Sequence, residues 1–135
     1  MADGPVFPHT PRPLRGLFSP LVSSAAGMSQ QQRFLETIAR NLANAQTTRT
    51  AEGGAYKREV TIADGGRTVT YQDGSEGDLV YLPNHPDADA KGYVRMPNVD
   101  PQQEMVDMLV ARRLHEANAT AFTAAKRMLQ RAIDI

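Results

Sequence analysis

From residue 102 to residue 135 the chain contains neither glycine nor proline, and this run constrains the fold more than any other feature. Asp100 can cap a helix here, Pro101 suits the first helical position, and Gln103 can complete a capping box. At about 1.5 Å per residue, a helix over 101–135 is roughly 50 Å long. Because the whole chain has only 135 residues, so long a helix needs apolar partners along its length.

Two apolar stripes follow this predicted helix, about 100° apart around its axis. The first stripe contains Val106, Val110, Leu114, Ala117, Ala121, Ala124, Met128 and Ile135, and the second contains Met108, Ala111, Phe122, Leu129 and Ile133. A single partner helix covers only one stripe, with a gain of roughly 25 cal/mol per Å² buried. The other stripe needs another chain, or it stays exposed as an adhesive patch.

A second amphipathic helix is predicted from Ser19-Pro20 to about residue 46, with Gly27 lowering its stability by about 1 kcal/mol. Polar residues, among them Arg40 and Asn41, lie away from its apolar side. We predict that the two helices pack as an antiparallel coiled coil, with the remaining stripe facing neighbouring subunits. The expected intrachain contacts are Leu21, Met28, Leu35, Ile38 and Leu42 against Val110, Leu114, Ala117, Ala121 and Met128, and the expected subunit interface is Met108, Phe122, Leu129 and Ile133.

The rest of the chain predicts little regular structure. Prolines at 5, 8, 11 and 13 indicate a disordered arm over residues 1–16. Residues 53–98 are rich in glycine, and short β-prone runs at 67–72 and 78–82 predict a few strands, paired as a hairpin. The expected fold is therefore mainly α with a small β part. Its helical domain is discontinuous, over 17–52 plus 99–135, and encloses a β/loop module over 53–98.

Composition argues against several classes of protein. Fifteen Lys plus Arg balance fifteen Asp plus Glu, so no net charge attracts nucleic acid or an anionic membrane. There is no cysteine for a disulfide, a thiol nucleophile or a thiolate metal site. No apolar run reaches the roughly 20 residues that span a bilayer, and the N-terminus does not resemble a secretory signal. Taken alone, these features predict a cytoplasmic protein.

Candidate chemical sites are weak. His85, Asp87 and Asp89 lack the paired histidines of a zinc site, so a turn with Asp side chains bonded to backbone amides is favoured. The acidic run 73–78 lacks the terminal glutamate of a calcium loop, which favours a solvated turn. His115 lies beside the second stripe, where a packed or interfacial histidine is expected. We find no catalytic constellation, and predict no enzyme, cofactor or metal site.

Two motifs resemble a known family. Residues Asn41, Leu42, Ala43, Asn44 and Ala45 resemble the Asn-Leu/Ile-Ala-Asn-Ala motif that ends the N-terminal helix of flagellar rod, hook and hook-associated proteins. The run 80–100 resembles the signature of the proximal-rod members of this family. Its characteristic residues are His85, Pro86, Asp87, Ala88, Asp89, Gly92, Tyr93, Pro97, Asn98, Val99 and Asp100. The resemblance covers about residues 17–56 and 79–135.

The resemblance implies a structural subunit of the bacterial flagellar basal body, in the part of the rod that crosses the periplasm. Terminal helices of this family form the inner coiled-coil layer of a helical tube that carries torque from motor to hook. The implied partners are copies of the chain, other rod proteins of the FlgB, FlgF, FlgG and FliE types, and the flagellar type III export apparatus, which recognises no cleavable signal peptide. Nucleic acid and direct membrane insertion are not implied.

Two segments depart from the family pattern: the proline-rich arm is longer than the usual start, and the middle over 56–78 is shortened. The alternative from another functional class is a small coiled-coil adaptor that binds a single protein partner. Oligomeric state discriminates between them, since an adaptor forms a discrete complex and a rod subunit forms open polymers.

Overall fold

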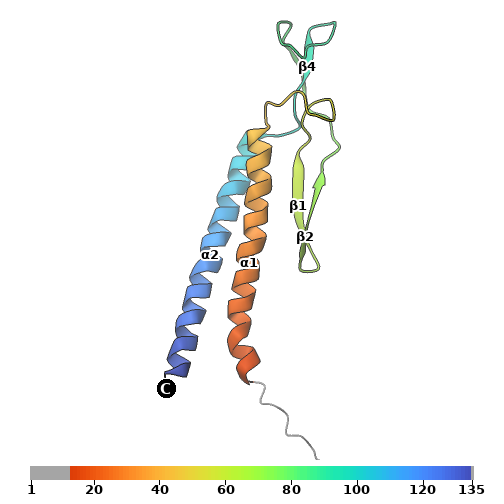
Figure 1. Ribbon diagram of the computed structural model, residues 1–135. Coiled ribbons are helices and arrows are strands. Elements are labelled where there is room, and N and C mark those ends of the chain that lie inside the picture. Colours follow the sequence, from red (N-terminus) through yellow and green to blue (C-terminus); the bar gives the residue numbers. More distant parts are fainter. Residues whose placement is uncertain (1–12, 135) are drawn as a thin grey trace, which may run out of the picture.

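The computed structural model describes residues 13–134 and is built around two long helices. Helix α1 (Pro13–Ala43) and helix α2 (Pro101–Ile133) lie side by side and antiparallel along most of their length (Figure 1). The expected class, mainly α with a small β part, is confirmed. No described helix has a stretch long and apolar enough to cross a bilayer.

Helix α1 begins earlier than predicted. The expected start at Ser19-Pro20 is wrong, because the helix already begins at Pro13 and contains Pro20. Proline at position 20 removes one backbone hydrogen bond, to the carbonyl of Gly16, and the helix continues past it to Ala43. Residues 13–16 of the predicted arm are therefore helical, and its other residues, 1–12, lie outside the described part of the chain.

The start of α2 follows the prediction with one difference. The Asp100 carboxylate accepts hydrogen bonds from the backbone N–H groups of Gln102 and Gln103, and Pro101 occupies the first turn. The Gln103 side chain does not close a capping box, however. It donates to the Asp107 carboxylate one turn further along the helix, at 2.9 Å.

The β part consists of two antiparallel hairpins. Strands β1 (Glu59–Asp64) and β2 (Arg67–Gln72) pair in register from Glu59↔Gln72 to Asp64↔Arg67. Both residues of the connecting turn, Gly65 and Gly66, have positive φ, as a two-residue hairpin turn of this kind requires. Strands β3 (Leu79–Tyr81) and β4 (Tyr93–Arg95) form the second hairpin, beyond the end of the helix pair where α1 ends and α2 begins (Figure 1).

The hydrophobic core is small. Among the described residues, the buried hydrophobic side chains are those of Ile38, Val94, Val99 and Ala111. The first hairpin lies along α1 on the side away from α2 (Figure 1). Helix α1 is therefore covered on two sides, whereas α2 is covered mainly by α1.

Candidate assembly surface and the junction that positions it

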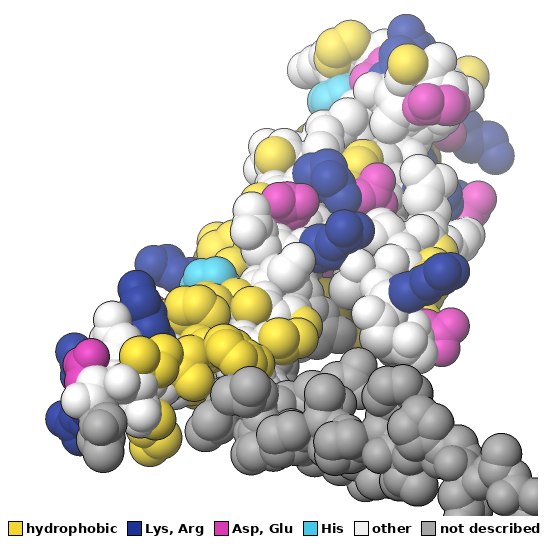
Figure 2. Space-filling model, turned by 60° about the horizontal axis from the view of Figure 1, so that its bottom comes forward, with side chains coloured by type: hydrophobic (Ala, Val, Ile, Leu, Met, Phe, Trp, Pro, Cys, Tyr) yellow, Lys and Arg dark blue, Asp and Glu magenta, His cyan; other side chains and the backbone are white. Residues whose placement is uncertain are grey.

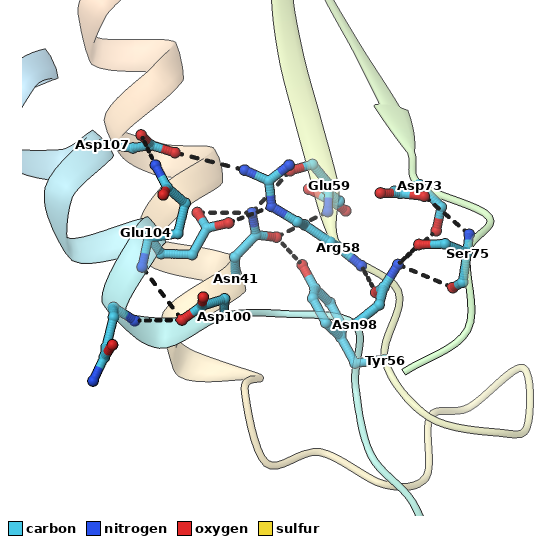
Figure 3. Close-up of polar contacts among 12 residues, drawn as sticks. Asn41, Tyr56, Arg58, Glu59, Asp73, Ser75, Asn98, Asp100, Glu104 and Asp107 are labelled. Atoms are coloured by element: carbon cyan, nitrogen blue, oxygen red, sulfur yellow. Dashed lines mark hydrogen bonds and ion pairs between the residues drawn. The ribbon is translucent and has the colours of Figure 1, made fainter. Parts of the chain in front are cut away.

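Asn41, in the last turns of α1, is the centre of a buried polar junction (Figure 3). Its side-chain oxygen accepts from the Glu59 N–H at 2.9 Å, and its amide nitrogen donates to the Glu59 carbonyl at 2.8 Å. The amide thus pairs with β1 as a neighbouring strand would. The sequence places Asn41 among the polar residues away from the apolar side of α1, and the structure buries it there because β1 covers that side.

A charged pair fixes the start of α2 at the same place. Glu104 is 1% exposed, and its two carboxylate oxygens accept from Arg58 Nε and from the Asn41 amide. The guanidinium of Arg58 also lies 3.7 Å from the Asp107 carboxylate. A buried carboxylate is tolerated only when its acceptors are satisfied, and both oxygens of Glu104 are. The pair therefore ties α2 to the segment that leads into β1.

Tyr56 and Asn98 complete the junction. The Tyr56 hydroxyl donates to the Asn41 side-chain oxygen at 3.0 Å, and burial, followed by the nearby Glu59 carboxylate, raises the pKa of this phenol. Asn98 accepts from the Arg58 N–H at 2.6 Å and donates to Asp73 and Ser75 across the loop. The junction thus joins both helices, the first hairpin and the segment before α2 (Figure 3).

Two Asp side chains of the loop 83–92 form hydrogen bonds, but only that of Asp89 forms the expected turn with backbone amides. Asp89 accepts from the backbone N–H groups of Lys91 and Tyr93, and the Tyr93 bond is the largest cause that holds the pKa of Asp89 below its usual value. Asp87 instead bonds two side chains that follow α1, Thr48 at 2.7 Å and Arg49 at 3.1 Å. The loop is thereby joined to the residues that follow the Asn41–Ala45 motif.

The described residues contain no group of three or more side chains suited to a metal ion. In the run 73–78, Asp73 accepts from the Ser75 N–H, which lowers the pKa of Asp73, and Glu76 pairs with Arg95. His115, expected to be packed or interfacial, is half-buried on α2, and its Nδ1 has no hydrogen-bond partner among the described residues.

The helix faces differ from the expected assignment of the two stripes on α2. Three residues predicted to pack within the chain are exposed: Val110 at 53%, Leu114 at 47% and Met128 at 70%. The structure also leaves Ala117 and Ala121 exposed, while Ala111 is buried and Met108, Phe122 and Leu129 are half-buried on the same side of the helix. The packed face of α2 is centred on Ala111, so the first stripe is the one left open. The last member of that stripe, Ile135, lies outside the described residues.

The physical reason for this difference is the pairing of the helices at their centre. A Cβ atom at Gly27 would lie 2.7–2.9 Å from the side-chain amide of Asn118, so α1 approaches α2 closely there. Asn118, with Ala111, His115 and Phe122, belongs to the side of α2 that faces α1. Because Asn118 is polar, the apolar pattern of the sequence did not indicate that this face is packed. Among the predicted packing residues of α1, Ile38 is buried, and Leu21, Met28, Leu35 and Leu42 are half-buried. On α2, Ile133 is 73% exposed.

An open groove of about 350 Å³ lies where α1, α2 and β1 meet. Its apolar walls include Phe34, Ile38, Val60, Val110 and Leu114. The junction residues Arg58, Glu104 and Asp107 line its polar part. Figure 2 shows hydrophobic side chains gathered over the two-helix part of the molecule. The exposed first stripe and this groove are the candidate assembly surface.

Of the residues that position this surface, the sequence identified Asn41 and Asn98 as motif residues, but not what they contact. Asn98 and Glu104 fall within the segments that resemble the family, but nothing in their spacing indicated that they bond to Arg58 and Asn41. Arg58 and Tyr56 carried no signal, because the partners of the Arg58 side chain are 46 or more residues away and the partner of the Tyr56 hydroxyl is in α1.

Comparison with known proteins supports one family. Residues 21–49 match the family described as flagella basal body rod protein, and residues 90–135 match the C-terminal family of the flagellar basal body rod FlgEFG proteins. Three relatives are named flagellar basal-body rod protein FlgC. That of Borreliella burgdorferi is 34% identical, covering 89% of this chain and 97% of its own. That of Bacillus subtilis is 35% identical, covering 87% and 97%, and that of Escherichia coli O6:H1 is 37% identical, covering 84% and 92%.

The Borreliella alignment extends over 148 residues, more than the 135 residues of this chain, so that relative contains residues that the chain lacks. The matched segments contain Asn41 and Glu104, the two buried polar side chains of the junction. With this coverage and identity, the chain belongs to the FlgC family of flagellar basal-body rod proteins.

Proposed function

We propose that this structural subunit of the basal-body rod assembles through the exposed stripe of α2 and the groove beside it. The observation that carries the proposal is the exposure of Val106, Val110, Leu114 and Met128 on one side of a long helix. An apolar stripe of this length is unfavourable in water and is typical of an interaction surface. Neighbouring subunits in a rod would cover it and gain the free energy of burial.

The junction has a separate part in this proposal. It holds the first hairpin against α1 through Asn41 and ties α2 to that hairpin through Glu104 and Arg58. Load on the hairpins would then pass to both helices through satisfied hydrogen bonds and a buried ion pair. Stiffness under torque, in this proposal, depends on the junction as well as on helix packing.

The finer expectations of the family complete the proposal. The subunit acts in the part of the rod that crosses the periplasm, next to copies of itself and other rod proteins, and catalyses no reaction. It reaches that place through the flagellar type III export apparatus without cleavage of a signal peptide. The mass of the protein recovered from purified basal bodies tests this last step, because the 135 residues of this chain, uncleaved, have a mass of 14.8 kDa.

The assembly proposal is tested with glutamate substitutions. Val106→Glu and Ala121→Glu each place a carboxylate on the exposed stripe, whereas Gln130→Glu places one on the polar side of the same helix. Because all three positions are exposed, circular dichroism of the purified variants should match the wild type. In a deletion strain, the two stripe variants should be absent from basal bodies and fail to restore motility.

Gln130→Glu should restore motility, which separates the stripe from a general effect of added charge. Normal rods built from both stripe variants would disprove the proposed surface. A discrete dimer or one-to-one complex in light scattering, with no role in basal bodies, would instead favour the adaptor.

A further inference from the structure

We propose that the groove between α1, α2 and β1 receives the last turns of α2 from a second copy of the chain. This inference rests on the proposed assembly of copies and specifies how two of them meet. The groove has apolar walls from three elements and is open to solvent. Its helix walls, near Phe34 and Leu114, are long enough to accept a further helix along the pair.

The last turns of α2 have a shape that fits such a groove. Ala121, Ala124, Met128 and Ala132, which we call the terminal ridge, are all exposed and recur at the three- and four-residue spacing of one helix face. Helices that dock in grooves present anchors at this spacing. The alanines permit close approach of the backbones, and Met128, at 70% exposure, is the one long side chain of the ridge available to enter the groove.

Charge favours the same pairing. The groove is lined by three carboxylates, those of Glu59, Glu104 and Asp107, and by the guanidinium of Arg58, while a second guanidinium, that of Arg40, pairs with Glu59. Two cations, Arg127 and Arg131, stand beside the terminal ridge, against the single carboxylate of Asp134, whereas Lys126 lies on the opposite side of the helix. The whole chain is neutral, so these opposite local charges attract copies to one another without an overall repulsion.

The positions of groove and ridge define the kind of assembly. They lie toward opposite ends of the helix pair, since 18 residues of α2 separate Val110 from Met128, or roughly 27 Å at 1.5 Å per residue. One copy's ridge can therefore fill its neighbour's groove while its own groove stays free for a third copy. A contact between two different patches is head-to-tail, and it extends as an open polymer unless the rotation closes a ring.

The absence of cysteine in the chain allows a direct test. Leu114→Cys places a thiol in the groove, and Met128→Cys places one on the terminal ridge. Both variants are expressed together in the deletion strain, basal bodies are isolated under oxidising conditions, and disulfide-linked products are separated without reductant. We expect a disulfide-linked dimer when the two variants are mixed, and at least tenfold less when either is expressed alone.

A matched control replaces Leu114→Cys with Glu116→Cys, which is exposed on the polar side of α2. This pair should give at most a tenth of the disulfide-linked dimer. Arg127→Glu in the Met128→Cys chain should lower the yield several-fold, because it reverses one of the attracting charges.

The outcomes separate this inference from the proposed function. Dimer formed by Leu114→Cys alone would mean a symmetric contact and would overturn the inference. A disulfide to a different rod protein carrying an introduced cysteine, with none between copies, would overturn it as well, although rod assembly through the stripe would stand. Absence of the wild-type chain from basal bodies would instead refute the proposed function itself.

Discussion

The side-chain amide of Asn41 pairs with both the N–H and the carbonyl of Glu59, so that one helix side chain occupies the edge of a β-strand. The same amide also bonds Tyr56 and Glu104, and its oxygen and nitrogen each have two partners. The side chain is only 1% exposed, so its polar atoms depend on these partners rather than on bulk solvent. Position 41 therefore requires an amide of this length.

Replacement of Asn41 by aspartate should unfold the junction. The new carboxylate would keep an acceptor for Tyr56 and Glu59, but it would lose both donated bonds and lie beside the carboxylate of Glu104. Loss of the donor and repulsion between buried like charges together should lower the free energy of unfolding by roughly 3 kcal/mol. Urea denaturation followed by circular dichroism measures this change.

Gln46→Glu is the matched control, because it makes the same amide-to-carboxylate change at an exposed position. Its free energy of unfolding should stay within about 0.5 kcal/mol of the wild type. Equal losses in both variants would show that Asn41 has no special role.

The buried pair at Glu104 should contribute more to stability than the exposed pair at Glu59. Both oxygens of Glu104 accept hydrogen bonds, whereas a glutamine there would offer only one acceptor, so Glu104→Gln should cost about 2 kcal/mol. Glu59 pairs with Arg40, which is largely exposed, and Glu59→Gln should cost less than about 1 kcal/mol.

Salt provides the second measurement for this comparison. Screening at high ionic strength should reduce the effect of Glu59→Gln and leave that of Glu104→Gln nearly unchanged. The free energies of unfolding of both variants are measured at low and at high salt. If salt changed them equally, the assignment of Glu104 to a buried site would be contradicted.

Much of the helical layer could be predicted from the sequence, because periodicity and caps are local signals. The start of α2 at Asp100-Pro101 and strand β2 at 67–72 lie where the sequence predicts them. The packed face of α2 could not be predicted in the same way. Asn118 and His115 interrupt its apolar pattern, whereas the exposed stripe has the more regular spacing. The regular spacing of apolar residues on α2 therefore indicated the exposed face, not the face that packs against α1.

The junction could not be predicted, because its bonds join residues that only the fold brings together. Asn41 and Glu104 are 63 positions apart, and each is polar, which indicates a surface position in a helix. The family motif that contains Asn41 identified it as a characteristic residue without showing what it contacts. A buried polar pair of this kind is visible only once both helices and β1 are placed.

The contact between Gly27 and Asn118 should make glycine necessary in the middle of α1. A Cβ at position 27 would lie 2.7–2.9 Å from the Asn118 amide, so Gly27→Ala should separate the helices and lower stability despite the higher helix propensity of alanine. Asn118→Ala removes the obstacle. The double variant should recover the loss and gain about 1 kcal/mol over Asn118→Ala alone. A double-mutant cycle by urea denaturation with no coupling between the two positions would contradict this contact.

Alkaline pH should weaken the junction through Tyr56. Burial and the Glu59 carboxylate raise the pKa of this phenol above its usual value of 10.0, because both disfavour the charged phenolate. The stability that Tyr56 contributes is therefore complete below pH 10 and is lost as the pH rises through the higher pKa of the folded state. Tyr56→Phe removes this titration and one hydrogen bond, so it should cost about 1 kcal/mol at neutral pH. Unfolding free energies measured from neutral pH to above the usual phenol pKa should converge for the two proteins. If they stayed parallel over that range, the Tyr56 hydroxyl would not be the group that titrates.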